Sequence, residues 1–197
     1  MEGKQALSSF RKRIETVATR LLIFIVFWTL SIAWPIAIAQ GLQQEENLLK
    51  AVFIYNFAKF TRWPEAIGNE GDSPLNICSL GSDELVRELE RLSGRNIKGH
   101  PVMIESKKDK NNLQNCHVLY LAHSLQQQYI KIIKSLAEKP ILTISELPDF
   151  ARSGGIIELY HKEGRISFII NLHIARKAGL DFSSRLLNLA EIVGQEE

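Results

Sequence analysis

The sequence predicts an α/β domain: a three-layer sandwich with a mainly parallel sheet and a C-terminal antiparallel hairpin. Short apolar runs alternate with helical patterns over residues 47–144, which favours strands and helices in alternation. Residues 116–122 are apolar almost throughout, as is typical of a buried parallel strand. Near the C-terminus, two strand-like segments at residues 155–161 and 165–172 are separated by only three residues, which predicts a hairpin.

The first predicted element is a helix over residues 47–60. Asn47 is placed to cap this helix, and Trp63–Pro64 ends it, because the residue before a proline avoids the α conformation. Apolar residues surround the helix almost completely. The strongly polar exceptions are Lys50, Asn56 and Lys59. A helix of this kind must be covered on most sides, so we expect cover from the domain itself and, in part, from a partner chain.

The elements that follow alternate between strands and helices. Strands are expected at residues 75–80, 101–105, 116–122 and 140–144, before the hairpin. A helix follows Ser82, and a second follows Ser124, which with Gln127 matches a capping box. The last helix is expected to begin at Ser183 or Ser184 and to end at Gly194.

Residues 1–39 have the layout of a secretory signal peptide. A basic leader precedes an apolar stretch over residues 21–32, and residues 37–39 form a small-x-small cleavage pattern. The alternative is an uncleaved membrane anchor, because residues 21–38 reach about the lower limit for crossing a bilayer. Positive charge stays on the cytoplasmic side in either case. We therefore expect residues 40–197 to form one domain in the periplasm.

Charge is distributed unevenly between these two parts. The chain has 24 basic and 22 acidic residues, a net charge of +2. The leader contains five of the basic residues and two of the acidic ones, which leaves 19 basic and 20 acidic residues in the exported part, a net of −1. Nucleic-acid binding requires a basic face, so this composition predicts no nucleic-acid partner.

Two cysteines, Cys78 and Cys116, lie in the exported part. Two thiols in an oxidising compartment usually pair. The bond would close a loop of about 38 residues and would stabilise the fold by about 4 kcal/mol in the chain-entropy model. The alternative is a pair of buried free thiols.

The remaining residues offer little for catalysis or metal binding. None of the histidines has the spacing of a zinc site. Neither a nucleophile motif nor a phosphate-binding glycine loop is present in the sequence. We therefore expect no enzymatic activity, no metal and no cofactor.

Two groups of residues are candidates for contact with another molecule. The first group, a partner or dimer surface, is Tyr55, Asn56, Lys59, Phe60, Arg62 and Trp63. Arg and Trp are typical anchor residues of interfaces. The alternative for Asn56 and Lys59 is an Asn that is buried and hydrogen-bonded in the core, beside a Lys whose ammonium reaches water. The second group, a ligand or partner patch, is Asn171, Arg176, Ser184 and Arg185. The start of the last helix lies in this group and offers free backbone N–H groups that could bind an anion. The alternative is that these residues only hold loops in place through hydrogen bonds.

Four blocks of the sequence resemble the YfiR-like family of periplasmic proteins. They follow the family order and cover about residues 47–193: residues 50–64; residues 116–121; residues 141–145 with Phe150, Gly154 and Gly155; and residues 168–172, 175–176, 178–180 and 183–184.

The resemblance implies a periplasmic repressor that binds the periplasmic part of a membrane-bound diguanylate cyclase and holds it inactive. It also implies that an outer-membrane lipoprotein can sequester the repressor, and that the protein forms a homodimer. Cys78 and Cys116 match one family disulfide; a second pair near the hairpin, which some members have, is missing here. The alternative function is a small-molecule-binding sensor, because parallel sheets often bind ligands at the carboxyl ends of their strands.

Overall fold

The computed structural model describes residues 20–21, 44–64 and 73–194. The predicted signal peptide, apart from residues 20–21, lies outside the described residues. No helix within the described residues combines the length and the apolar character needed to span a bilayer. The strands and helices discussed below lie in the unit Asn47–Glu197, apart from the first three residues of the N-terminal helix.

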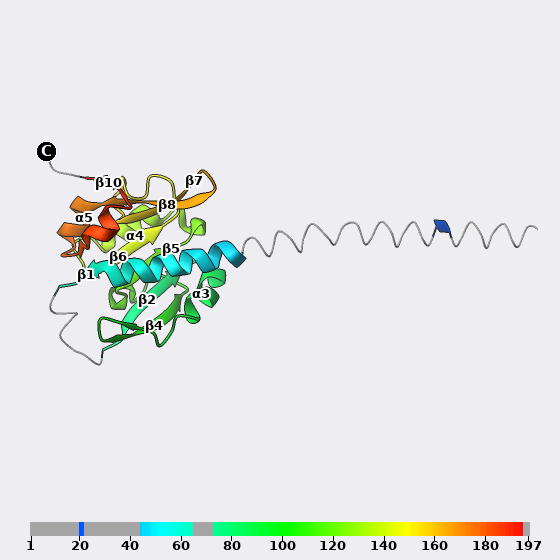
Figure 1. The fold of residues 1–197 in the computed structure, drawn as a ribbon, viewed down its shortest axis with the longest axis horizontal. Helices are drawn as coiled ribbons and strands as arrows, with labels where there is room; N and C mark the ends of the chain where they lie inside the picture. Colours follow the sequence, from blue (N-terminus) through cyan, green and yellow to red (C-terminus); the bar gives the residue numbers. More distant parts are fainter. Residues whose placement is uncertain (1–19, 22–43, 65–72, 195–197) are drawn as a thin grey trace, which may run out of the picture. The chain divides into compact units, whose positions relative to one another are not determined.

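The described residues form a mixed sheet with the strand order β10-β8-β7-β6-β5-β2-β4-β3 (Figure 1). The strands are β2 (Leu75–Leu80), β3 (Asn96–Ile97), β4 (His100–Lys107), β5 (Val118–Leu121), β6 (Leu142–Ser145), β7 (Ile157–Lys162), β8 (Arg165–Asn171) and β10 (Glu191–Val193). Neighbours pair in parallel except β3–β4 and β7–β8, which are antiparallel. The predicted α/β class with a mainly parallel sheet is confirmed, and a C-terminal antiparallel pair is present.

A separate two-stranded sheet pairs β1 with β9. The bounds are Thr61–Arg62 for β1 and Asp181–Phe182 for β9. The helices are an N-terminal helix over residues 44–60, α3 (Asp83–Glu90), α4 (Tyr129–Ser135), α5 (Leu172–Lys177) and α6 (Ser184–Leu187). Side chains cap three of them: Ser82 caps α3, Asn171 caps α5 and Ser183 caps α6.

Buried apolar residues form one cluster on each face of the sheet. In β5, Val118 and Tyr120 belong to one cluster, whereas Leu119 and Leu121 belong to the other. Successive side chains of a strand point to opposite faces, so the two clusters lie on opposite sides. The N-terminal helix contributes to the first cluster and crosses the sheet in Figure 1. Helix α4 contributes to the second cluster.

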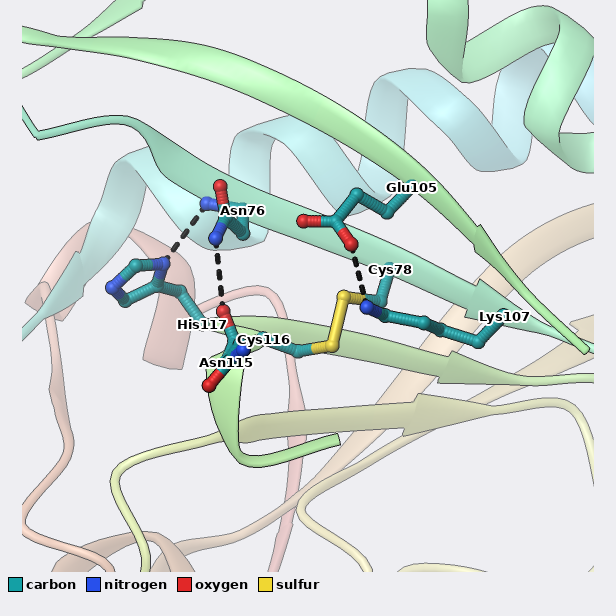
Figure 2. Close-up of a disulfide and its surroundings, with 7 residues drawn as sticks. All are labelled: Asn76, Cys78, Glu105, Lys107, Asn115, Cys116 and His117. Carbon is teal, nitrogen blue, oxygen red and sulfur yellow. Dashed lines mark hydrogen bonds and ion pairs between the residues drawn. A yellow bond between two sulfur atoms is a disulfide. The ribbon is translucent and has the colours of Figure 1, made fainter. Parts of the chain in front are cut away.

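The predicted disulfide is confirmed. Cys78 in β2 is bonded to Cys116, which lies just before β5, and their Cα atoms are 5.8 Å apart. This separation lies within the usual range for a disulfide. Both residues are buried in the second cluster, so the bond ties two neighbouring parallel strands together inside the core (Figure 2).

The predicted capping box at Ser124 is wrong. The Ser124 hydroxyl donates to the carbonyl of Gly81, 3.2 Å away, and so braces the loop after β2. A 3₁₀ turn occupies His123–Leu125, and α4 begins later, with Gln128 as an N-cap that makes no side-chain bond. The Ser124 hydroxyl therefore bonds to a carbonyl distant in the chain and not to the backbone of the helix that follows it.

The predicted last helix is also shorter than expected. It ends at Leu187, and Glu191–Val193 instead form β10 beside β8. Leu189, which follows the end of this helix, is 76% exposed. The outer edge of β8 offers unpaired backbone groups, and pairing with them overrides the weak helical pattern of this short segment.

Candidate functional site

The pairing of β1 with β9 brings the end of the first candidate group close to part of the second. Arg62 lies opposite Asp181, and the amide of Ser183 donates to the carbonyl of Phe60 at 3.0 Å. The end of the N-terminal helix therefore lies beside the start of α6, although Arg62 and Asp181 are 119 residues apart in the chain. We call Arg62, Arg176, Asp181, Ser184 and Arg185 the arginine edge.

Asp181 is the acidic member of the arginine edge. The hydrogen bond from Arg62 holds the pKa of the Asp181 carboxyl below its ordinary value, and the charge of Arg176 also lowers it. Burial of Asp181 acts in the opposite direction and is outweighed. Asp181 is therefore ionised near neutral pH and carries one negative charge beside the exposed Arg62 and Arg176.

Asn171 lies apart from this edge, in the interior. Its side-chain oxygen accepts the amide of Ile174 at 3.0 Å, and its side-chain nitrogen donates to the carbonyl of Ala151 at 2.7 Å. The side chain is buried and caps α5. Asn171 therefore braces the chain through hydrogen bonds, which was the alternative to ligand binding for this residue.

The rest of the first group lies along the N-terminal helix and just beyond it. Tyr55 is half-buried and donates to the carbonyl of Asn96, while Asn56 and Phe60 are half-buried and Lys59 is exposed. Trp63 is half-buried, and its indole N–H donates to the carbonyl of Ala58 at 3.4 Å.

One side of the same helix is not covered by the domain. Leu48, Leu49 and Val52 are between 39 and 45% exposed, whereas Ala51, Ile54, Phe57 and Ala58 are fully buried. Asn56 lies one helical turn after Val52 on the same side, and Lys59 follows on the next turn. We call Leu48, Leu49, Val52, Asn56 and Lys59 the helix stripe.

A cavity of about 270 Å³ lies at the amino ends of β2, β4 and β5. The described residues that line it are Arg62, Trp63, Ser73, Pro74, Leu75, Ile97, Lys98, His100 and His117. Parallel sheets often bind ligands at the carboxyl ends of their strands, whereas this cavity opens at the amino ends. Arg62 and Trp63 therefore contribute to the cavity as well as to the first candidate group.

His117 is fixed on one side of its ring. Its Nδ1 accepts the backbone N–H of Asn76 at 2.9 Å, so the neutral ring carries its proton on Nε2. Figure 2 shows Nε2 on the far side of the ring from the disulfide. Burial lowers the pKa of His117 below its ordinary value of 6.5, and the charge of His100 lowers it further. Among the described residues, no group of three or more His, Cys, Asp or Glu could hold a metal ion.

A buried ion pair beneath the N-terminal helix was not foreseen from the sequence. Lys50 is only 6% exposed, and its Nζ lies 2.8 Å from the Glu146 carboxylate, which follows β6. The hydroxyl of Tyr120 in β5 donates to the other oxygen of Glu146. Lys50 and Glu146 are far apart in the chain and carry no pattern that links them, so only the fold reveals the contact.

Comparison with known proteins identifies the family. A family model described as YfiR/HmsC-like matches residues 47–191, which include both candidate groups, the cavity and the disulfide. The family consists of periplasmic regulators of the diguanylate cyclase pathway and is generally non-enzymatic. This chain belongs to the YfiR/HmsC-like family.

Proposed function

We propose that this chain represses a membrane-bound diguanylate cyclase by binding directly to the periplasmic part of that enzyme. Family membership supports a regulatory role in this pathway. The observation that supports direct binding is the pairing of β1 with β9. Exposed residues from both candidate groups lie on or next to these two strands. In the same proposal, an outer-membrane lipoprotein that sequesters the chain releases the cyclase.

The chemistry of the arginine edge indicates what the partner surface offers. Arg62, Arg176 and Arg185 are exposed, and Asp181 balances only part of their charge. The planar guanidinium group suits recognition of carboxylates. An acidic face on the cyclase would be guided to this edge, because charge complementarity sets specificity and association rate.

We propose further that the helix stripe is the surface of a homodimer. Its three apolar residues are each about 40% exposed, and Asn56 and Lys59 give it a polar end. A second copy of the chain would cover the side of the helix that the domain leaves open. Light scattering of the Val52→Lys variant should show a monomer, and the matched Leu189→Lys variant, at an exposed site, should remain a dimer. Dimeric Val52→Lys protein would place the dimer surface elsewhere.

Direct repression is tested by reversing charge on the arginine edge. The variant Arg176→Glu/Arg185→Glu should bind the purified periplasmic part of the cyclase at least about tenfold more weakly, since each lost charged contact is worth roughly 1.5–3 kcal/mol. Cellular cyclic di-GMP should rise toward the level of a deletion strain. The matched control is Lys131→Glu/Lys134→Glu on exposed positions of α4, which should bind normally.

Two results would count against this proposal. If deletion of the gene left cyclic di-GMP unchanged in a strain with a paired cyclase, repression would be excluded. If the arginine variant repressed as well as the control variant did, contact through the arginine edge would be wrong.

A further inference from the structure

We propose that the cavity at the amino ends of β2, β4 and β5 binds a small organic anion, a carboxylate or a phosphate attached to a compact apolar body. This inference does not rest on cyclase repression, because it concerns the isolated chain. It follows from the charges, the backbone and the shape of the cavity wall.

Two cationic side chains, Arg62 and Lys98, and two imidazoles, His100 and His117, line the described wall of the cavity. No carboxylate is among the described lining residues, and Asp181, which pairs with Arg62, is not one of them. The ammonium of Lys98 donates to the carbonyl of Thr61 at 2.7 Å and meets no carboxylate among the described residues. Burial and the nearby charge of Arg62 both lower the pKa of Lys98. A bound anion would offset this concentration of positive charge.

The backbone at Lys98 is held in an unfavourable conformation. Lys98–Gly99 form the two-residue turn between β3 and β4, and both have positive φ, 54° for Lys98 and 98° for Gly99. Asn, Asp or Gly is preferred at the first position of such a turn, and other residues are strained there. The structure thus tolerates strain at a residue whose ammonium reaches the cavity wall, a combination found at binding sites.

The two imidazoles supply directed hydrogen-bonding groups. Among the described residues, Nε2 of His117 has no acceptor for its proton. His100 is buried, and its Nδ1 lies 2.9 Å from the carbonyl of Ser73, so that nitrogen carries the proton in the neutral ring. An oxyanion in the cavity can therefore accept from Nε2 of His117.

The remaining wall and the volume limit the size of the ligand. Trp63, Pro74, Leu75 and Ile97 provide apolar surface. An apolar cavity of about 150 Å³ is enough for benzene. The volume of about 270 Å³ here therefore suits one ring or a short branched chain with a single anionic group.

The test is a calorimetric titration of the protein purified from the periplasm. Benzoate and phenyl phosphate are the two anionic probes, inorganic phosphate tests the anion without an apolar body, and benzamide is the neutral analogue of benzoate. At least one organic anion should bind, and it should bind about tenfold or more tightly than benzamide or inorganic phosphate. Which of the two binds more tightly distinguishes carboxylate from phosphate. Equal binding of benzoate and benzamide, or no binding of either organic anion at millimolar concentration, would overturn the proposal.

Substitution of Lys98 separates binding from folding. Lys98→Asn should weaken binding of the anion about tenfold while leaving the melting temperature close to that of the native protein, because relief of the turn offsets the loss of the hydrogen bond to Thr61. The matched control is Glu163→Asn, since Glu163 has a φ of 52° in the two-residue Glu163–Gly164 turn of β7–β8. That variant should bind the anion normally. If Lys98→Asn bound as tightly as the control, the cavity would not be the site.

The pH dependence gives an independent check. Among the residues that the structure describes, the charged and titratable groups that line the cavity with His117 are His100, Lys98 and Arg62, and Asp181 pairs with Arg62. Binding of benzoate should tighten as the pH falls from about 7.5 to about 5.5, because His117 gains positive charge as it is protonated. The His117→Asn variant should lose much of this dependence. An affinity for benzoate that does not change with pH in the native protein would exclude His117 as a ligand of the anion.

Discussion

Histidine 117 shows how one side chain joins a strand to a cavity. Its Nδ1 holds the backbone of Asn76 in β2, and its ring meets the ring of Trp63 edge to face at a centroid distance of 6.2 Å. The residue follows Cys116, so the disulfide fixes the backbone from which the ring projects. His117 is therefore positioned by the core and by the segment after the N-terminal helix at the same time.

The lowered pKa of His117 makes stability depend on pH. The unfolded chain, with an ordinary pKa of 6.5, takes up a proton at this residue more readily than the folded chain does. The free energy of unfolding should therefore be highest above that value and fall as the pH decreases below it. His117→Asn, whose side-chain oxygen can accept the Asn76 amide, should reduce this slope in urea denaturation between about pH 7 and about pH 5. An unchanged slope would show that other groups cause it.

The buried pair of Lys50 and Glu146 should matter for stability. Lys50→Met would leave the Glu146 carboxylate without its ammonium partner under the N-terminal helix. Removal of one member of a buried ion pair lowers the free energy of unfolding by roughly 3–5 kcal/mol. Because Glu146 is partly exposed, we expect a loss of about 3 kcal/mol or less here. Chemical denaturation measures the loss. Lys59→Met, at an exposed position of the same helix, should change stability by less than about 0.5 kcal/mol.

At the scale of elements, short strands decide how the helices are arranged. The two-residue pair β1–β9 fixes the end of the N-terminal helix to the chain that leads into α6. Strand β10 pairs with β8 and fixes the last residues that the structure describes. Helices α5 and α6 are short, so their capping side chains and these strands, rather than helix propensity, hold them in place.

Asn171 links three of these elements. It ends β8, caps α5 and donates to the carbonyl of Ala151. Asn171→Ala should lower the free energy of unfolding by about 2 kcal/mol, since it removes both a cap and a buried hydrogen bond. Asn171→Ser restores the cap alone and should recover about half of that loss. Equal stability of the Ala and Ser variants would mean that capping contributes little.

At the scale of the whole molecule, the disulfide joins strands at the centre of the sheet. Cys78 and Cys116 are almost completely inaccessible to solvent, at 0% and 2% exposure. Their bond belongs to the cluster that α4 covers, while the N-terminal helix covers the opposite face. Each face therefore has its own apolar packing, and the disulfide reinforces the face that lacks the N-terminal helix.

Removal of the disulfide should destabilise the whole domain. Cys78→Ser/Cys116→Ser should lose about 4 kcal/mol of stability and show a lower melting temperature than the native protein. Reductant should act slowly on the native protein, because the buried sulfurs are reached only when the domain opens. Mass spectrometry after thiol labelling follows that rate. Rapid reduction without loss of structure would contradict this account of the core.

The sequence by itself determined most of the sheet, the disulfide and the family. Apolar runs and turn residues are local signals, so β2 was predicted with its observed bounds and α3 with its observed cap at Ser82. With two cysteines in the chain, a single pairing within the chain is possible. The predicted capping box at Ser124 was wrong because the Ser124 hydroxyl donates to the distant carbonyl of Gly81. The predicted last helix was too long because residues 191–193 pair with the edge of β8 instead.

Only the tertiary structure decided where the functional residues meet. Arg62 and Asp181, Lys50 and Glu146, and the two histidines of the cavity are brought together by strand order and helix packing. These contacts depend on the relative position of elements that are distant in the chain, whereas periodicity and capping depend on neighbours within a few residues. The sequence could therefore name Arg62 and Trp63 as candidates, but it could not place them at both a surface edge and a cationic cavity.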